Sequence, residues 1–192
     1  MSIRERKMFY HLTDLNNIDS IIEYGLLPRK TIIDNKIKFN DVADNEIINF
    51  RKLHGLDEFI PFHFYPFTPF DWDVQTTHKS KIFIYICITK EIAKHNNLKI
   101  IPMHPLSMNP FILYDYKDGL DEINWILMET KNYKNGECKK ICLAECLCDK
   151  RIPLECFQSI AVKDEETKMY IQEKVNKPNI KIHIDVRKNW FI

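Results

Sequence analysis

The sequence has little glycine and no long apolar run, and each absence excludes a class of protein. Only four of its 192 residues are glycine, and neither a G-x-G-x-x-G fingerprint nor a G-x-x-x-x-G-K-[ST] loop occurs, so the common glycine-rich nucleotide sites are excluded. No stretch reaches the roughly 18 apolar residues of a membrane-spanning helix, and the first residues lack the apolar region of a signal peptide. We therefore expect a cytoplasmic protein that does not contact a membrane.

The sequence also lacks an excess of charge of either sign. Its 28 basic and 27 acidic residues leave a net charge of +1, so no overall field attracts nucleic acid. Contact with DNA or RNA would need local basic patches, and the alternative is that these side chains are ordinary solvated surface residues. The candidates are Arg4, Arg6, Lys7, Lys131, Lys134, Lys139 and Lys140.

Length and composition predict one folded domain over residues 1–192. The content of 45% hydrophobic and 29% charged residues is typical of globular proteins. A chain of this length buries about 70% of its unfolded surface, which is enough for a substantial core. Aromatic residues make up 12%, so we expect a core or cleft rich in rings.

Four of the six cysteines lie within residues 138–148, in the pattern C-x3-C-x3-C-x-C. Disulfides are uncommon in the cytoplasm, and the pattern lacks the paired C-x2-C knuckles of zinc ribbons. We therefore predict no metal site and interpret these cysteines as small buried residues. A zinc-stapled nucleic-acid-binding module without catalytic activity is the alternative hypothesis.

Hydrophobic periodicity predicts many short strands and a few short helices. A helix begins at Thr13 or Asp14 and ends at Gly25, and Asp44 and Asp164 cap two more; residues 28–44 and 104–124 are predicted loops. Residues 81–89 are apolar on both faces, as in a central strand. This pattern indicates an α+β fold with a split, mostly antiparallel sheet and short flanking helices. The predicted strands are 8–11, 59–65, 81–89, 99–103, 139–148, 159–163 and 180–186, and the helices are 14–24, 44–53, 91–97, 121–130 and 164–175.

Glu145 is the most informative single residue. On a predicted strand over 141–148, alternation places it on a face that is otherwise apolar. A lone carboxylate among apolar residues is unfavourable unless it is paired, and such positions are enriched in functional groups. The alternatives are an edge-strand glutamate that points to water and a glutamate that bridges to a structural arginine.

His11 and Arg51 are weaker candidates when taken alone. His11 ends the first predicted strand just before a helix, where side chains and backbone donors point into a cleft, although a lone histidine is more often a core or capping residue. Arg51 lies between a short predicted helix and a proline-rich aromatic segment, and an isolated arginine there is usually a solvated surface residue.

Taken together and in order, four segments resemble the DarT family of DNA ADP-ribosyltransferase toxins. FYHLTDLNNIDSIIEYGLLPRK (9–30) is similar to the family's opening histidine motif, and EIINFRKL (46–53) to the segment that holds its essential arginine. FIPFHFYPFTPF (59–70) resembles the family's "VPFYF-x-P-x-x-P" stretch, and LAECL (143–147) the segment with its catalytic glutamate. The closing strand and helix over 159–175 are also similar, so the resemblance spans nearly the whole chain.

The resemblance implies an ADP-ribosyltransferase-like fold that uses NAD⁺ as its substrate. Glu145 then stabilises the positive charge that develops on the ribose when nicotinamide leaves. Arg51 holds the pyrophosphate or the target base, since its guanidinium binds phosphate in a fork. The implied catalytic residues are Glu145 and Arg51, and the implied NAD⁺-binding residues are His11, Leu12, Thr13, Ser20, Pro28 and Arg51.

The resemblance also implies thymine in single-stranded DNA as the acceptor, and an antitoxin partner with ADP-ribosylglycohydrolase activity. Bases in single strands are accessible, and they stack on aromatic side chains. The candidates for stacking are Phe67, Phe70 and Trp72, followed by Tyr114, Tyr116 and Trp125, whereas Phe62 and Phe64 are expected in the core.

The chain departs from the family pattern at several positions. His63 stands where the family commonly has tyrosine, Phe67 where it often has arginine, and residues 70–72 where apolar residues are usual. Residues 104–142, which would contain the target-selecting loop, match poorly. Transfer to RNA, guanine or protein is therefore retained as an alternative.

Overall fold

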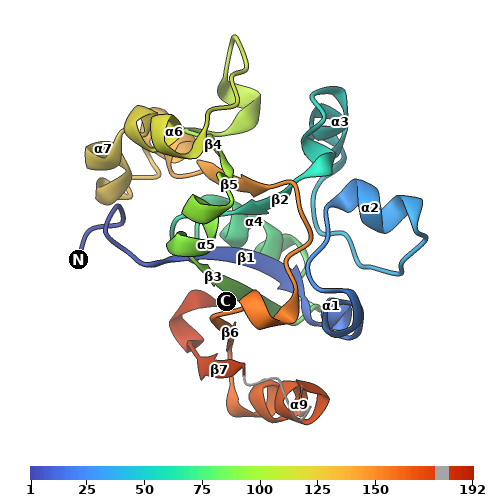
Figure 1. Ribbon diagram of the computed structural model, residues 1–192. Coiled ribbons are helices and arrows are strands. Elements are labelled where there is room, and N and C mark those ends of the chain that lie inside the picture. Colours follow the sequence, from blue (N-terminus) through green and yellow to red (C-terminus); the bar gives the residue numbers. More distant parts are fainter. Residues whose placement is uncertain (176–181) are drawn as a thin grey trace.

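The computed structural model describes residues 1–175 and 182–192 as two β-sheets surrounded by short helices (Figure 1). The pairing is antiparallel throughout except between β6 and β7. This arrangement confirms the predicted α+β fold with a split, mostly antiparallel sheet. The larger sheet has the order β1 (Met8–Asp14), β3 (Phe83–Thr89), β6 (Ser159–Val162), β7 (His183–Val186), and the smaller has β2 (Ile60–Phe62), β5 (Glu145–Cys148), β4 (Lys99–Ile101).

Strand β3 lies between β1 and β6, as its apolar sequence predicts. Its residues from Phe83 to Ile88 are all buried, because side chains cover both faces of the strand. The neighbouring β1 pairs with it in the register His11 to Ile86. This rigid pair carries the residues that line one side of the site described below.

The two sheets are joined at one edge of β1. Tyr10 exchanges both backbone hydrogen bonds with His63, at 3.0 and 2.8 Å, just beyond the end of β2. The bridge brings the smaller sheet, including β5, close to the first strand of the larger one.

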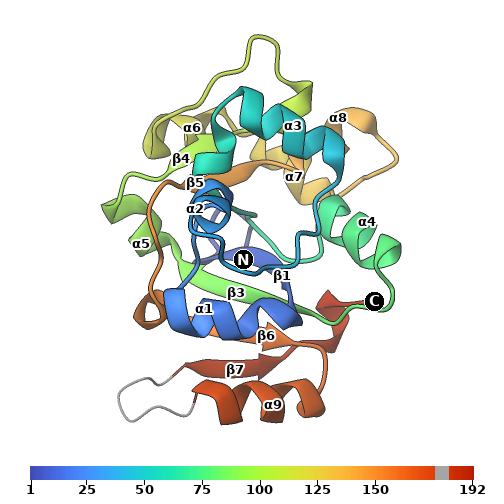
Figure 2. The ribbon, with the colours of Figure 1, turned by 90° about the vertical axis from the view of Figure 1, so that its right-hand side faces the viewer.

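The helices are short and cover the outer surfaces of both sheets (Figure 2). Helices α1 and α9 contact each other beside the larger sheet, while α6 packs against β4 and α7 against α8. None of the helices in the described ranges combines the length and apolar character needed to cross a bilayer. The helices are α1 (Ile18–Tyr24), α2 (Arg29–Asp34), α3 (Asn45–Leu53), α4 (Pro69–Thr77), α5 (Lys90–His95), α6 (Tyr116–Glu122), α7 (Trp125–Thr130), α8 (Gly136–Ile141) and α9 (Glu165–Val175).

Several helix ends lie where the sequence predicts them. The Asp44 side chain accepts from the Ile47 amide at 2.9 Å, and the Asp164 side chain accepts from Thr167 at 2.8 Å. Gly25 ends α1 with a φ of 78°, and a Cβ there would lie 2.5 Å from the Ile152 carbonyl oxygen. Glycine is therefore required at this position by both the backbone angle and the close approach.

Other elements differ from the sequence prediction. Residues 139–148 are not one strand: the side chain of Asn135 accepts from the Cys138 amide and starts α8, so β5 begins only at Glu145. The predicted loops contain α2 and α6, and the predicted turns after residue 65 contain α4. Thr68 and Asp71 form a capping box around Pro69, which favours a helix start. The predicted strand 180–186 is seen as β7, and its residues 180–181 lie outside the described residues.

Candidate active site

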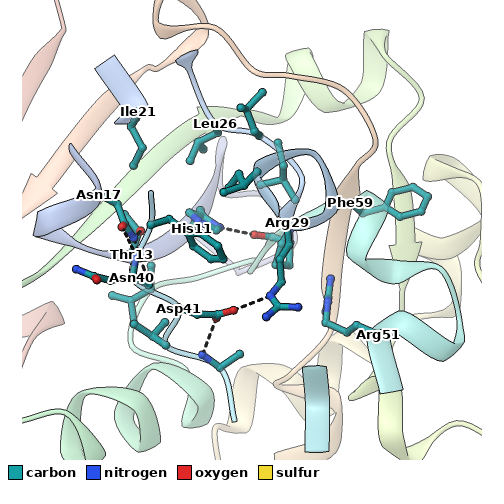
Figure 3. A pocket seen from close by; sticks show the side chains of 18 of the residues that line it. His11, Thr13, Asn17, Ile21, Leu26, Arg29, Asn40, Asp41, Arg51 and Phe59 are labelled. Carbon is teal, nitrogen blue, oxygen red and sulfur yellow. Dashed lines mark hydrogen bonds and ion pairs between the residues drawn. The ribbon is translucent and has the colours of Figure 1, made fainter. Parts of the chain in front are cut away.

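A pocket of about 190 Å³ lies where β1, β5 and the end of α3 meet. Its lining also includes residues of α1 and α2, together with residues 37 and 39–43 of the segment that connects α2 to α3 (Figure 3). The fold thus brings together six residues that the sequence predicts for the site. They are His11, Leu12, Thr13, Ser20, Arg51 and Glu145.

Glu145 and Arg51 form a buried ion pair in this pocket. Arg51 lies in the last turn of α3, and its Nη1 donates to the two Glu145 carboxylate oxygens at 2.8 and 3.2 Å. Their side chains are only 10% and 11% exposed. Strand β5 is the central strand of its sheet, so the alternative of an edge-strand glutamate that points to water is wrong. The lone carboxylate expected to need a partner has one in Arg51.

His11 is held as a neutral imidazole on β1. Its Nδ1 lies 2.8 Å from the Pro61 carbonyl oxygen, which makes Nδ1 the protonated nitrogen. Burial lowers the pKa of His11 to about 4, although the bond to Pro61 acts in the opposite direction. The ring is therefore uncharged at neutral pH and leaves Nε2 as a hydrogen-bond acceptor.

Leu12 contributes its backbone to the pocket. Tyr10 uses the outer edge of β1 to pair with His63, and backbone groups of an antiparallel strand point to the same edge at every second residue. The N–H and C=O of Leu12 therefore face outward on that edge. In the described part of the chain, no strand pairs with β1 here beyond the Tyr10 bridge.

Thr13 and Ser20 each form a hydrogen bond with Asn17. The Asn17 side-chain amide donates to Thr13 Oγ1 at 3.1 Å, and Ser20 Oγ donates to the Asn17 carbonyl at 2.9 Å. Pro28, also predicted for the site, is buried at the start of α2. It lies between two lining residues, Leu27 and Arg29, and is not itself part of the lining.

The structure adds residues that the sequence analysis did not single out. Asn17 and Asn40 form a reciprocal pair, in which the Asn40 amide donates to Asn17 Oδ1 at 2.7 Å and Asn17 Nδ2 donates to the Asn40 carbonyl at 3.0 Å. Arg29 Nε lies 2.6 Å from Asp41 Oδ2. The only indication of Arg29 in the sequence was its position directly after Pro28, a predicted site residue.

Two further histidines line the pocket near Glu145. His63 Nδ1 lies 3.3 Å from the Ala144 carbonyl oxygen, and its ring packs against Phe70 with centroids 5.6 Å apart. Burial lowers the pKa of His104, and the nearby Glu145 carboxylate opposes this shift. The pocket lining therefore holds two further imidazole rings besides that of His11.

The aromatic residues considered for base stacking differ in how far they are exposed. Trp72 is 50% exposed, and Phe70 lines the pocket beside His63. Tyr116 is buried, with its hydroxyl near the Lys90 carbonyl, so the prediction that it contacts the target is wrong. Phe62 and Phe64 are fully buried, which confirms that they belong to the core. Phe67, Tyr114 and Trp125 are half-buried.

The cysteines are packed as small apolar residues. Five of the six are buried, and Cys156 is half-buried. Cys138 on α8 and Cys142, the residue that caps the C-terminal end of α8, have their sulfur atoms 3.9 Å from each other, whereas Cys146 and Cys148 lie on β5. Within residues 1–175 and 182–192, no three His, Cys, Asp or Glu side chains are grouped as metal ligands. The zinc-stapled alternative therefore has no ligand set in this part of the chain.

Comparison with known proteins identifies the family. The family model "ssDNA thymidine ADP-ribosyltransferase, DarT" matches residues 10–192. A DNA ADP-ribosyl transferase–DNA ADP-ribosyl glycohydrolase fusion protein of Thermosipho africanus is 26% identical over 184 residues, covering 90% of this chain and 47% of that protein. The chain thus spans about half the length of this relative.

Two further relatives match over nearly their whole length. A DNA ADP-ribosyl transferase of Escherichia coli O127:H6 is 18% identical over 97% of this chain and 94% of its own. The structure of Thermus sp. 2.9 DarT in complex with ADP-ribosylated ssDNA shares the fold, with a TM-score of 0.81, 17% identity and coverage of 100% of this chain and 99% of that one. The resemblance inferred from the four sequence segments is confirmed, and this chain belongs to the DarT family of ssDNA thymidine ADP-ribosyltransferases.

Proposed function

We propose that this chain cleaves NAD⁺ and transfers its ADP-ribose to a thymine base in single-stranded DNA, as the toxin of a toxin–antitoxin pair. The observation that carries the proposal is the buried Arg51–Glu145 pair, which faces a pocket within a DarT-family fold. The family match over residues 10–192 supports the treatment of 1–192 as a single ADP-ribosyltransferase domain.

Glu145 is the proposed catalytic carboxylate. As the bond between nicotinamide and the ribose breaks, the bonding electrons leave with nicotinamide and positive charge develops on the ribose. A carboxylate fixed in a water-poor site stabilises that charge better than water does, because it need not reorient during the reaction. A ring nitrogen of thymine then bonds to the ribose carbon, and the proton that this nitrogen carried passes to water.

Arg51 is the proposed partner of this carboxylate and of the substrate. Its Nη1 contacts both Glu145 oxygens, so it fixes the orientation of the carboxylate. Its Nη2 donates to the Leu56 carbonyl oxygen at 3.5 Å, which leaves the remaining N–H groups of the guanidinium for an anionic or carbonyl group of the substrate. We do not assign it the removal of the thymine proton, because arginine has a pKa above about 12 and is a poor base.

The strand edge at Leu12 suits the nicotinamide carboxamide. A carboxamide offers one acceptor and two donors, which complement the outward N–H and C=O of a single strand residue. His11 and Thr13 flank this position and complete the wall. Ser20 is the proposed contact on the side of α1, whereas Pro28, which is buried and outside the pocket lining, is not proposed as a contact.

The decisive experiment is mass spectrometry of a thymine-containing single-stranded oligonucleotide incubated with the protein and NAD⁺. We expect a mass gain of one ADP-ribose, absent for Glu145→Gln and retained for Glu137→Gln, a matched control at an exposed carboxylate on α8. Label on RNA, guanine or protein instead would contradict the proposed acceptor. The absence of NAD⁺ consumption would contradict the enzymatic function as a whole.

The proposal includes a cytoplasmic location and an antitoxin that removes the modification. The Thermosipho africanus relative joins a transferase to a DNA ADP-ribosyl glycohydrolase in one chain, which supports a partner of that activity. Co-expression with such a glycohydrolase is expected to relieve growth inhibition by this chain.

A further inference from the structure

Arg29 is a second cation in the lining of the pocket, besides Arg51. It occupies the first position of α2, and its side chain points toward the segment 37–43 (Figure 3). Its Nε lies 2.6 Å from Asp41 Oδ2, and the two side chains are 24% and 29% exposed. This ion pair is thus partly open to the pocket, unlike the buried Arg51–Glu145 pair.

The Arg29 guanidinium has a donor left without an acceptor. Its Nη1 is buried, and it has no hydrogen-bond partner among the residues that the structure describes. Buried N–H donors are nearly always satisfied, so an unsatisfied one in a pocket wall indicates a group that binds there. Arg51 differs, because its Nη1 already serves both oxygens of Glu145.

We propose that Arg29 binds the pyrophosphate of the dinucleotide, and that Asp41 is a resident counter-ion which the pyrophosphate displaces. The identity of the ligand as a dinucleotide rests on the proposed function. A guanidinium binds phosphate oxygens in a planar fork, and its charge persists at every relevant pH. Asp41 cannot keep its full contact when a doubly charged pyrophosphate arrives, because the two anions repel each other.

This exchange couples ligand binding to the segment 37–43. Asp41 belongs to that segment, where its Oδ1 also accepts from the Ala43 amide at 3.2 Å. The adjacent Asn40 stays paired with Asn17 through two hydrogen bonds. The pyrophosphate is therefore expected to release one of two attachments of the segment and to leave the other in place.

The test measures dissociation constants by calorimetry for ADP-ribose, which carries the pyrophosphate, and for adenosine, which does not. Arg29→Gln is expected to weaken ADP-ribose binding about tenfold or more, since it removes a charged hydrogen-bond donor to phosphate. Asp41→Asn is expected to tighten it several-fold, and neither change should alter adenosine binding. Lys30→Gln is the matched control, because Lys30 is the next residue on α2 and pairs with Glu58 outside the pocket.

The opposite signs of the two variants are the signature of the exchange. Unchanged ADP-ribose affinity in Arg29→Gln would overturn the pyrophosphate assignment, and weaker binding in Asp41→Asn would overturn the counter-ion role. A wild-type protein that binds neither NAD⁺ nor ADP-ribose would overturn this inference together with the proposed function. Arg29-dependent binding of ADP-ribose without modification of DNA would overturn only the proposed acceptor.

Discussion

The two walls of the pocket are built in different ways. One wall consists of β1, β5 and the last turn of α3, and its Arg51–Glu145 pair is held between a paired strand and a helix. The other consists of the short helix α2 and the segment 37–43, attached through Asn17 and Arg29. The first wall is fixed by backbone hydrogen bonds and burial, and the second by a few side-chain contacts near solvent.

This difference corresponds to different tasks in the proposed reaction. Charge stabilisation needs groups that do not move, which strands and buried pairs supply. A bulky dinucleotide needs a way in and out, which a segment with few buried contacts supplies at low cost.

The largest effect is expected from a substitution at Arg51, in the first wall. Arg51→Ala leaves the buried Glu145 carboxylate unpaired, which is expected to lower the free energy of unfolding by about 3–5 kcal/mol. Turnover is expected to fall by about 100-fold or more, as for loss of a preorganised charge. Urea unfolding measures the change in the free energy of unfolding, and initial reaction rates measure the change in turnover. Lys52→Ala, at the exposed next residue of α3, is the control and should change neither. A loss of less than about 1 kcal/mol would show that the pair does not hold this wall together.

An effect of intermediate size is expected from the titration of His11, which makes the free energy of unfolding depend on pH. Its pKa is about 4 in the folded protein and near 6.5 when unfolded, so between these values the unfolded chain binds more protons. Stability from this residue is therefore present above pH 6.5 and is lost as pH falls toward 4. We expect about 1–2 kcal/mol of unfolding free energy to disappear between pH 7.5 and pH 5. In His11→Gln that part of the loss should be absent, and an unchanged pH profile would refute the assignment of His11 as a neutral imidazole.

The smallest effect is expected from loosening the second wall. Asn17→Ala removes the hydrogen bonds to Thr13 and Asn40, so the KM for NAD⁺ is expected to rise up to about tenfold while kcat stays within a few-fold. Amide exchange over residues 37–43 should accelerate, and Asn16→Ala, at an exposed neighbour, should behave as wild type. A fall in kcat with an unchanged KM would contradict the assignment of catalysis to the first wall and of NAD⁺ binding to the second.

The sequence alone predicted the first wall better than the second wall. β3 was predictable because a β-branched and aromatic run has few alternatives to a central strand. The need of Glu145 for a partner followed from its apolar surroundings, although its partner Arg51 lies 94 residues away along the chain. Arg29 and Asp41 were missed because each looks like an ordinary surface charge, and only the folded segment brings them together. The start of α8 was missed because Cys, Ile and Leu are compatible with both a strand and a short helix.

Because the cysteines are buried, the rate at which their thiols react with a dye can be used to measure opening of the fold. Since five thiols are buried and the sixth is half-buried, a maleimide dye should react slowly with the folded chain and quickly with the unfolded one. The labelling rate of the five buried thiols in dilute dye would then report how often the structure around them opens. The substitution Lys36→Cys, at an exposed residue beside the segment 37–43, would carry a fluorophore for single-molecule observation with little competition from the native thiols.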